Sequence, residues 1–355
     1  MKIGLIGLPN TGKTTIFNAL TQQEAEVTPY AGARTEPHIA VIEVADPRLD
    51  RLTDLYHPRK TVSASVNFID FAGLSDGAAD DGSFSANATA LMRNTDALAL
   101  VLRHFPLPGM PSPDPVRELG RLEEELALSD LILVENRLER IEHQLGRGRR
   151  TREIEQEQAT LKMLHEHLSN GLPPGELELS PDAAKLVRGF RLFSLKPYLA
   201  VLNSDESLFG RDPELTAEIR SRRPVLEFAG KFEMELSRLE EADAALFRED
   251  MGIPAAARDR LLRLAYMTLG YISFFTVGQD EVRAWNLHHG DTALDAAAVI
   301  HSDLARGFIR AERFSYDDII ACGSEKALKE KGRISLEGKE YTVSDGDILN
   351  IRFSV

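Results

Sequence analysis

The first fifteen residues contain the side chains whose types and spacing point most directly to chemistry. The stretch from Gly7 to Thr14, GLPNTGKT, matches the phosphate-loop pattern G-x-x-x-x-G-K-[ST]. Gly7 and Gly12 let the backbone curl so that successive N–H groups point at phosphate oxygens. The pattern predicts that Lys13 contacts the β- and γ-phosphates of a nucleotide and that the Thr14 hydroxyl coordinates Mg²⁺.

The segments on either side are those that a phosphate loop requires. Ile3, Leu5 and Ile6 form an apolar run that predicts a buried strand, and residues 16–20 are apolar at helical spacing. A strand before the loop and the positive end of a helix after it favour phosphate binding over a glycine-rich turn that binds nothing. The predicted nucleotide contacts of the loop are Asn10, Thr11, Gly12, Lys13, Thr14 and Thr15.

A second motif, Asp70-Phe-Ala-Gly73, follows a strand that the sequence predicts over residues 62–70. An acid at the carboxyl end of a buried strand, one βαβ unit after a phosphate loop, is where such NTPases hold Mg²⁺. The glycine amide three residues later senses the γ-phosphate. We therefore predict Asp70 as a metal ligand and Lys13, Asp70 and Gly73 as the catalytic set.

Composition indicates a multidomain globular protein. The chain has 355 residues, of which 43% are hydrophobic, and no stretch approaches the length of a membrane span or resembles a secretory signal. The single cysteine, Cys322, cannot form an internal disulfide, which is typical of a cytoplasmic protein. A net charge of −14 argues against nucleic-acid binding by the whole surface, and we expect no DNA partner.

The spacing of apolar residues changes in the middle of the chain. Further strands are predicted over residues 38–44, 96–102, 196–202 and 224–228, and residues 73–90 are predicted to form a loop. Between them, leucines and isoleucines at helical spacing from 116 to 171 predict an antiparallel helical hairpin. Its tip contains Arg147, Arg149, Arg150 and Arg152, which either contact RNA phosphates or are simply solvated.

The remainder is predicted to close the sheet and then form a separate small domain. Helices are expected over residues 233–249 and 258–266. The tail from 271 has predicted strands over 272–277, 281–287, 308–314, 333–336 with 339–343, and 347–353, and one helix over 292–304. This order suggests an α+β domain.

Several of these motifs, taken in order, resemble the YchF or Obg-like ATPases. They are the phosphate loop, Asp46-Pro-Arg-Leu-Asp-Arg-Leu, Asp70-Phe-Ala-Gly-Leu, Asn203-Ser-Asp-Glu, Val282-Arg-Ala-Trp and Gly307-Phe-Ile-Arg-Ala-Glu. The resemblance implies an α/β Ras-like P-loop domain of OBG type (residues 1–115 and 193–270), an inserted coiled-coil hairpin (116–192) and a C-terminal TGS domain of β-grasp type (271–355). It also implies slow Mg²⁺-dependent hydrolysis of ATP, often also GTP, and association with ribosomes. The hairpin tip and the TGS-like tail would be the docking modules.

The base-recognition loop departs from that of GTPases. The aspartate that accepts two hydrogen bonds from guanine is replaced by Glu206, and the lysine that stacks on the base by Ser204. Both changes should weaken guanine discrimination, because a misplaced buried carboxylate leaves polar groups unpaired. We expect ATP to be accepted and preferred. Asn203 would tie the loop together and Ser204 would lie against the base, with the other side closed by Ala229, Gly230 and Lys231.

The two switch segments also differ from the family pattern. Leu74 replaces the glutamine that orients the attacking water, so hydrolysis should be slow or need another group, a K⁺ ion or a partner. Asn10 resembles the asparagine that binds K⁺ in related GTPases, or else it stabilises the turn.

Arg34 occupies the place of the metal-binding threonine in the family's Thr-x-Glu/Asp-Pro-Asn segment. Either Thr35 shifts to reach the metal, or coordination is incomplete and Arg34 contacts phosphate. The second switch is acidic, Asp76-Gly-Ala-Ala-Asp-Asp-Gly.

Three other functions remain to be distinguished from a slow regulatory ATPase. One is a nucleotide-gated binding protein with negligible turnover, which Leu74, Arg34 and the acidic second switch favour. Another is a conventional GTP-specific GTPase. A P-loop kinase is disfavoured by the Asn203-x-x-Glu206 loop and by the lack of an arginine-rich lid.

Overall fold

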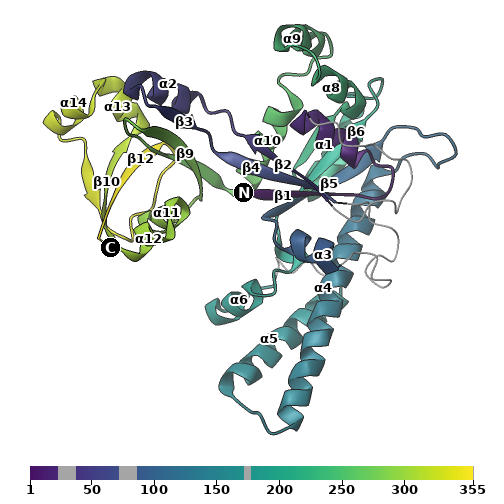
Figure 1. Cartoon of the computed structure of the whole chain (residues 1–355). Helices are drawn as coiled ribbons and strands as arrows, with labels where there is room; N and C mark the ends of the chain where they lie inside the picture. Colours follow the sequence, from purple (N-terminus) through teal and green to yellow (C-terminus); the bar gives the residue numbers. More distant parts are fainter. Residues whose placement is uncertain (23–36, 72–85, 172–176, 355) are drawn as a thin grey trace. The chain divides into compact units, whose positions relative to one another are not determined.

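The computed structural model describes residues 1–22, 37–71, 86–171 and 177–354 (Figure 1). The chain forms two compact units. The P-loop unit consists of Lys2–Ala40 and Phe68–Arg258, and the C-terminal unit consists of Met1, Val41–Asn67 and Asp259–Val355. The segment Val41–Asn67, which the sequence analysis assigned to the nucleotide domain, therefore groups with the tail.

A six-stranded sheet organises the P-loop unit, in the order β2-β4-β1-β5-β6-β7. Its strands are β1 (Lys2–Ile6), β2 (His38–Glu43), β4 (Ser65–Asp70), β5 (Ala97–His104), β6 (Tyr198–Ser204) and β7 (Val225–Phe228). Residues 41–43 of β2 and 65–67 of β4 group with the C-terminal unit. The pairs β1–β5, β5–β6 and β6–β7 are parallel. Their carboxyl ends consequently meet at one edge, where the phosphate loop follows β1 and Asn203 is the last residue but one of β6. Asp70 ends β4, the neighbour of β1 in the sheet.

Helices cover both faces of this sheet, which is why β5 and β6 are buried along their whole length. On one face, α1 (Lys13–Thr21) lies against α8 (Gly230–Leu236). On the other, α4 (Pro115–Gly146) and α7 (Pro213–Arg222) pack on the strands. The apolar core there includes Leu98, Leu100, Leu102, Leu119, Leu122, Leu126, Leu202 and Ile219.

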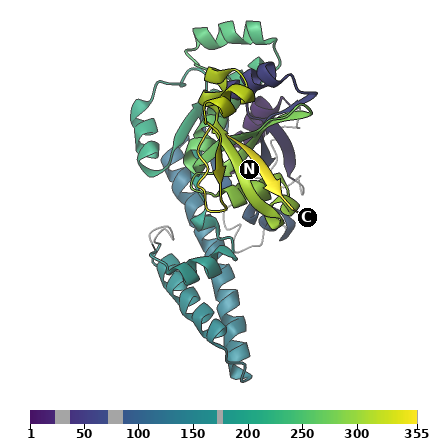
Figure 2. The ribbon, with the colours of Figure 1, turned by 90° about the vertical axis from the view of Figure 1, so that its left-hand side faces the viewer.

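The helical hairpin predicted from leucine spacing is present. It consists of α4 and α5 (Arg152–Ser169), which extend together away from the sheet in both views (Figures 1 and 2). Val134, Ile141, Leu161, Leu164 and Leu168 form its core, and α6 (Pro181–Arg188) adds Val187. The fully buried carboxylate of Asp130 in α4 anchors the root of the hairpin. It accepts hydrogen bonds from the backbone N–H groups of Phe193 and Ser194 at 3.0 and 2.8 Å.

The C-terminal unit is an α+β domain built on a second sheet, in the order β11-β10-β12-β8-β9-β3. The strands are β3 (Lys60–Val62), β8 (Tyr271–Thr276), β9 (Glu281–His288), β10 (Phe308–Ser315), β11 (Ser335–Glu337) and β12 (Asp347–Phe353). On one face lie α11 (Ala293–Ile300) and α12 (Ser302–Arg306). On the other lie α2 (Pro47–Tyr56), α13 (Tyr316–Cys322) and α14 (Glu325–Glu330).

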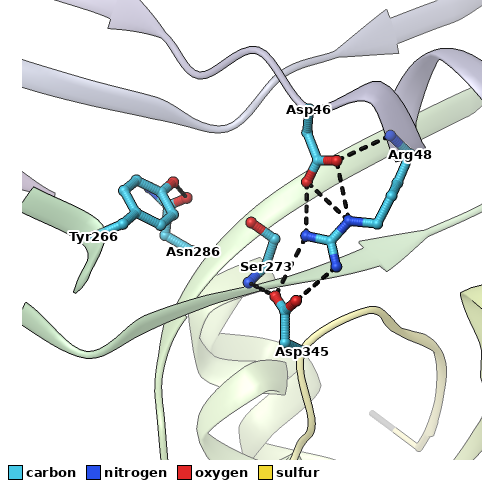
Figure 3. A network of polar contacts seen from close by, with 6 residues as sticks. All are labelled: Asp46, Arg48, Tyr266, Ser273, Asn286 and Asp345. Carbon is cyan, nitrogen blue, oxygen red and sulfur yellow. Dashed lines mark hydrogen bonds and ion pairs between the residues drawn. The ribbon is translucent and has the colours of Figure 1, made fainter. Parts of the chain in front are cut away.

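The Asp46-Pro-Arg motif attaches α2 to this domain. Arg48 is held between two carboxylates, because its guanidinium donates to Asp46 at 2.8–3.2 Å and to Asp345 at 2.7 and 3.3 Å (Figure 3). Asp345 also accepts the backbone N–H of Ser273 in β8 at 2.8 Å. Leu49 and Leu52 on the same helix are buried in the domain core. The motif is therefore structural in this chain.

Several sequence-based boundaries were wrong. The strand predicted over 62–70 is two strands, because β3 leaves to pair with β9 while β4 stays in the P-loop sheet. The helix over 233–249 is α8 and α9 (Glu241–Asp250), and that over 292–304 is interrupted at His301. Residues 339–343 contribute one isolated bridge, Thr292 to Thr342, and no strand.

The helices that the sequence analysis missed are short and depend on their caps. Asp212, Ser315 and Ser324 accept hydrogen bonds from the first turns of α7, α13 and α14. A further helix, α3 (Ala86–Arg93), begins within the segment 73–90 that was predicted to be a loop. The helix predicted over 258–266 is longer, α10 (Ala257–Leu269). No helix in the described segments is both long and apolar enough to cross a membrane.

Candidate functional site

The phosphate loop has the backbone conformation that its glycines and asparagine predict. Gly12 has φ 81° and Asn10 has φ 64°, a left-handed conformation that asparagine tolerates better than most residues. At Gly7 the constraint is space, because a Cβ would lie 2.5 Å from the carbonyl oxygen of Val101 in β5. Thr11 is buried and its hydroxyl donates to the Leu8 carbonyl at 3.0 Å, while Thr15 is half-buried in the first turn of α1.

Lys13, Thr14 and Asp70 come together at the end of this loop. The ammonium of Lys13 donates to the carbonyl oxygens of Gly7 and Leu8 at 3.1 and 3.0 Å. The Thr14 hydroxyl donates to Asp70 Oδ2 at 3.0 Å, and Asp70 is only 1% exposed. Burial lowers the pKa of Lys13 from 10.5 to about 8, against the opposing attraction of Asp70. These residues meet in space although 56 residues separate Thr14 from Asp70.

The donor set at this point fits a hard divalent cation. A buried carboxylate and a threonine hydroxyl within 3.0 Å supply the oxygen ligands that Mg²⁺ prefers. Within the residues that the structure describes, no group of three or more His, Cys, Asp and Glu side chains is placed to hold a metal. Of the predicted site residues, Thr35 and Gly73 lie outside the described residues, as do Arg34, Leu74 and residues 76–82.

Asn203 joins the phosphate loop to the loop after β7. Its side-chain amide donates to the Thr11 carbonyl at 2.9 Å and accepts the Gly230 N–H at 3.2 Å. The two glycines around it make room, because a Cβ on Gly12 would lie 2.2 Å from Asn203 Nδ2 and one on Gly230 would lie 2.3 Å from Asn203 Oδ1. The structure thus gives a physical reason for a glycine at both positions.

The base-side residues divide into an exposed and a buried group. Glu206 and Lys231 are exposed, and Ala229 and Gly230 are buried. Ser204 ends β6 and is 3% exposed, and its hydroxyl donates to Glu227 Oε1 at 2.6 Å and lies 2.9 Å from His104 Nδ1. The predicted position of Ser204 against a base stays a prediction, but its hydroxyl already has protein partners.

His104 and Glu227 were missed by the sequence analysis. His104 is opposite Ser204 in the parallel register of β5 and β6, and Glu227 lies on the next strand, β7. Glu227 also accepts the backbone N–H of Gly210 at 3.2 Å, so it fixes both ends of the turn that carries Glu206. The signal was available only through the register of three strands, since neither residue belongs to a motif.

The arginines of the hairpin tip are exposed, whereas His165 and His288 contact other side chains. Arg147, Arg149, Arg150 and Arg152 are all exposed where α4 turns into α5. His288 stacks on Tyr271, with ring centroids 4.1 Å apart, and His165 Nε2 lies 3.0 Å from Glu135 Oε1. The arginines of the tip are therefore accessible to solvent, and these two histidines have ordinary structural contacts.

The N-terminal and C-terminal parts of the chain each match a known protein family. Residues 2–137 match the family model described as "50S ribosome-binding GTPase", and residues 271–354 match the YchF-GTPase_C model, described as "Protein of unknown function (DUF933)". A relative from Bacillus subtilis (strain 168), named "Ribosome-binding ATPase YchF", is 36% identical over 99% of each chain. This chain belongs to the YchF family. The resemblance seen in the sequence is therefore confirmed.

Other YchF proteins agree in extent. The Escherichia coli O157:H7 protein of the same name is 32% identical over all of this chain and 99% of its own length. The solved structure of the Schizosaccharomyces pombe YchF GTPase superposes with a TM-score of 0.79 at 27% identity, covering 99% of this chain and 97% of that one. These matches confirm the predicted fold class, a P-loop domain followed by a YchF C-terminal domain.

Proposed function

We propose that this YchF-family chain is a nucleotide-binding regulatory NTPase that hydrolyses ATP slowly with Mg²⁺ and associates with ribosomes. The observation that carries the proposal is the convergence of Lys13, Thr14 and Asp70 under a loop that Asn203 holds in place. The names of its relatives, ribosome-binding ATPases, support the activity and the partner.

The described residues would act mainly by position and charge. Lys13 and the loop N–H groups would bind the β- and γ-phosphates, and Thr14 and Asp70 would hold Mg²⁺. When bound, the metal neutralises charge on the phosphate oxygens. Water would attack the γ-phosphate in line, and the Gly73 amide and Thr35 are the further contacts that the family pattern predicts there.

ATP is the proposed nucleotide, with GTP as a second substrate. The carboxylate of Glu206 is one methylene longer than the aspartate of GTPases, and the Ser204 hydroxyl is bound to Glu227 rather than presented to a guanine. Asn203, Ala229, Gly230 and Lys231 would line the remaining sides. Asn10 is the candidate for a K⁺ contact next to the phosphates.

The ribosome contact is proposed at two places. The four exposed arginines of the hairpin tip carry charge that suits ribosomal RNA phosphates, in a chain whose net charge is −14. The TGS-like region 271–355 is the second. Such a partner makes the cytoplasm the expected location, and RNA rather than DNA the expected nucleic acid.

A nucleotide-gated binding protein with negligible turnover is the alternative, favoured by Leu74 in place of the water-orienting glutamine. Phosphate release should be measured with ATP, Mg²⁺ and K⁺, with and without ribosomes, alongside Lys13→Ala. We expect slow release that the substitution abolishes. Tight ATP binding without release under any of these conditions would replace the ATPase proposal with the alternative.

A further inference from the structure

His38, the first residue of β2, has a ring nitrogen close to the carboxylate of Asp70. Its Nδ1 is buried, and no hydrogen-bond partner for it occurs within the described ranges 1–22, 37–71, 86–171 and 177–354. The atom lies 4.0 Å from Asp70 Oδ2, which accepts the Thr14 hydroxyl at 3.0 Å. The ring is held beside Phe17 of α1, with centroids 5.9 Å apart. An imidazole nitrogen thus lies 4.0 Å from the carboxylate of the proposed metal site.

The separation argues for an intervening group. Hydrogen bonds from nitrogen to oxygen span about 2.7–3.2 Å, so 4.0 Å is too long for a direct one. Leaving a buried polar atom unpaired is unfavourable, because its desolvation is not compensated by a hydrogen bond. Bonds from nitrogen or oxygen to a small divalent cation are about 2.0–2.2 Å, so two donors 4.0 Å apart can share one ion.

We propose that His38 Nδ1 is a third protein donor to the divalent cation held by Thr14 and Asp70. The proposal rests on the proposed function, because it concerns the metal that accompanies the nucleotide. It also gives a role to a departure from the family pattern, which has asparagine where this chain has His38 and threonine where it has Arg34. One nitrogen among oxygen donors favours Mn²⁺ or Co²⁺ relative to Mg²⁺, because imidazole suits transition metals better than it suits Mg²⁺.

The decisive experiment detects the nitrogen at the metal. Full-length protein labelled with ¹⁵N only in histidine is loaded with Mn²⁺ and a non-hydrolysable ATP analogue, and pulsed electron paramagnetic resonance records ¹⁵N hyperfine coupling to Mn²⁺. We expect coupling from one directly bonded histidine. It should disappear in His38→Asn, the residue of the family pattern, and persist in His57→Asn, where asparagine tolerates the left-handed backbone at φ 47°.

A second measurement follows metal preference in the same variants. The ratio of Mn²⁺ to Mg²⁺ affinity of the nucleotide complex should fall about tenfold in His38→Asn and stay unchanged in His57→Asn. Thermal unfolding of both variants checks that they fold. Bound Mn²⁺–nucleotide without any ¹⁵N coupling would overturn the role of His38 while leaving the proposed function intact. Failure of the wild type to bind Mn²⁺–nucleotide or Mg²⁺–nucleotide would overturn both.

Discussion

The phosphate end and the base end of the proposed nucleotide site are built by different means. The phosphate end is formed mainly by backbone. Asn10 and Gly12 have the left-handed conformation, and Gly7 lies too close to β5 for a residue with a Cβ. At the base end the side chains of Ser204, His104 and Glu227 form a buried hydrogen-bonded group. A backbone cradle suits any nucleoside triphosphate, whereas a side-chain network can be changed to select a base.

The largest expected effect comes from removing charge at the phosphate end. Lys13→Ala should lower ATP turnover about 10²–10³-fold, because a preorganised charge is lost where the transition state is most negative. Single-turnover phosphate release measures it. Lys185→Ala, on the exposed side of α6, is the matched control and should behave as wild type. Equal turnover in the two variants would contradict the assignment of Lys13.

Asn203 should affect both ends at once. Asn203→Ala removes two buried hydrogen bonds, to the Thr11 carbonyl and from the Gly230 N–H, and should cost about 1–3 kcal/mol in the free energy of unfolding. Affinities for ATP and GTP should fall together, because the bridge does not distinguish bases. Denaturant unfolding and calorimetric titration measure the two effects, with Asn136→Ala on exposed α4 surface as the control. Loss of affinity for only one nucleotide would assign Asn203 to the base end alone.

Ser204 should affect the base end only. Ser204→Ala leaves His104 and Glu227 without the hydroxyl that joins them, so the turn carrying Glu206 should loosen and ATP affinity should fall a few-fold, about 1 kcal/mol. Affinity for inorganic tripolyphosphate, which has no base, should not change. Ser221→Ala, on an exposed position of α7, is the control. A parallel loss of tripolyphosphate affinity would show that the two ends are not separable.

A smaller effect concerns protons at the phosphate end. Burial lowers the pKa of Lys13 to about 8 in the nucleotide-free protein, below its value of 10.5 in the unfolded chain. Between these values the unfolded chain binds more protons, so the free energy of unfolding should rise as pH increases from about 8 to about 10.5. Phosphate groups favour charged Lys13, so ATP binding near pH 8.5 should take up protons. Calorimetry in buffers of different ionisation enthalpy measures the uptake, which should vanish in Lys13→Met; an unchanged uptake there would contradict it.

The difference between the phosphate end and the base end also explains which features could be predicted from the sequence. The phosphate loop was recognisable because its glycine spacing and the flanking apolar patterns are local, and the hairpin because leucine spacing over residues 116–171 is regular. His104 and Glu227 could not be selected, because their proximity to Ser204 depends on the register of β5, β6 and β7. The proximity of His38 to Asp70 likewise depends on the neighbouring positions of β2 and β4. The split of residues 62–70 into two strands was missed because β3 finds its partner, β9, far along the chain.

We expect that the base end of the proposed nucleotide site does not select guanine. Calorimetric titration of ATP and GTP, each with Mg²⁺, into the wild type and Glu206→Asp tests it most directly. We predict tighter ATP than GTP for the wild type, and a shift of the affinity ratio toward GTP by about tenfold in Glu206→Asp, because the shorter carboxylate can pair with the guanine edge. Tighter GTP than ATP in the wild type, with no change of the ratio in Glu206→Asp, would contradict the account.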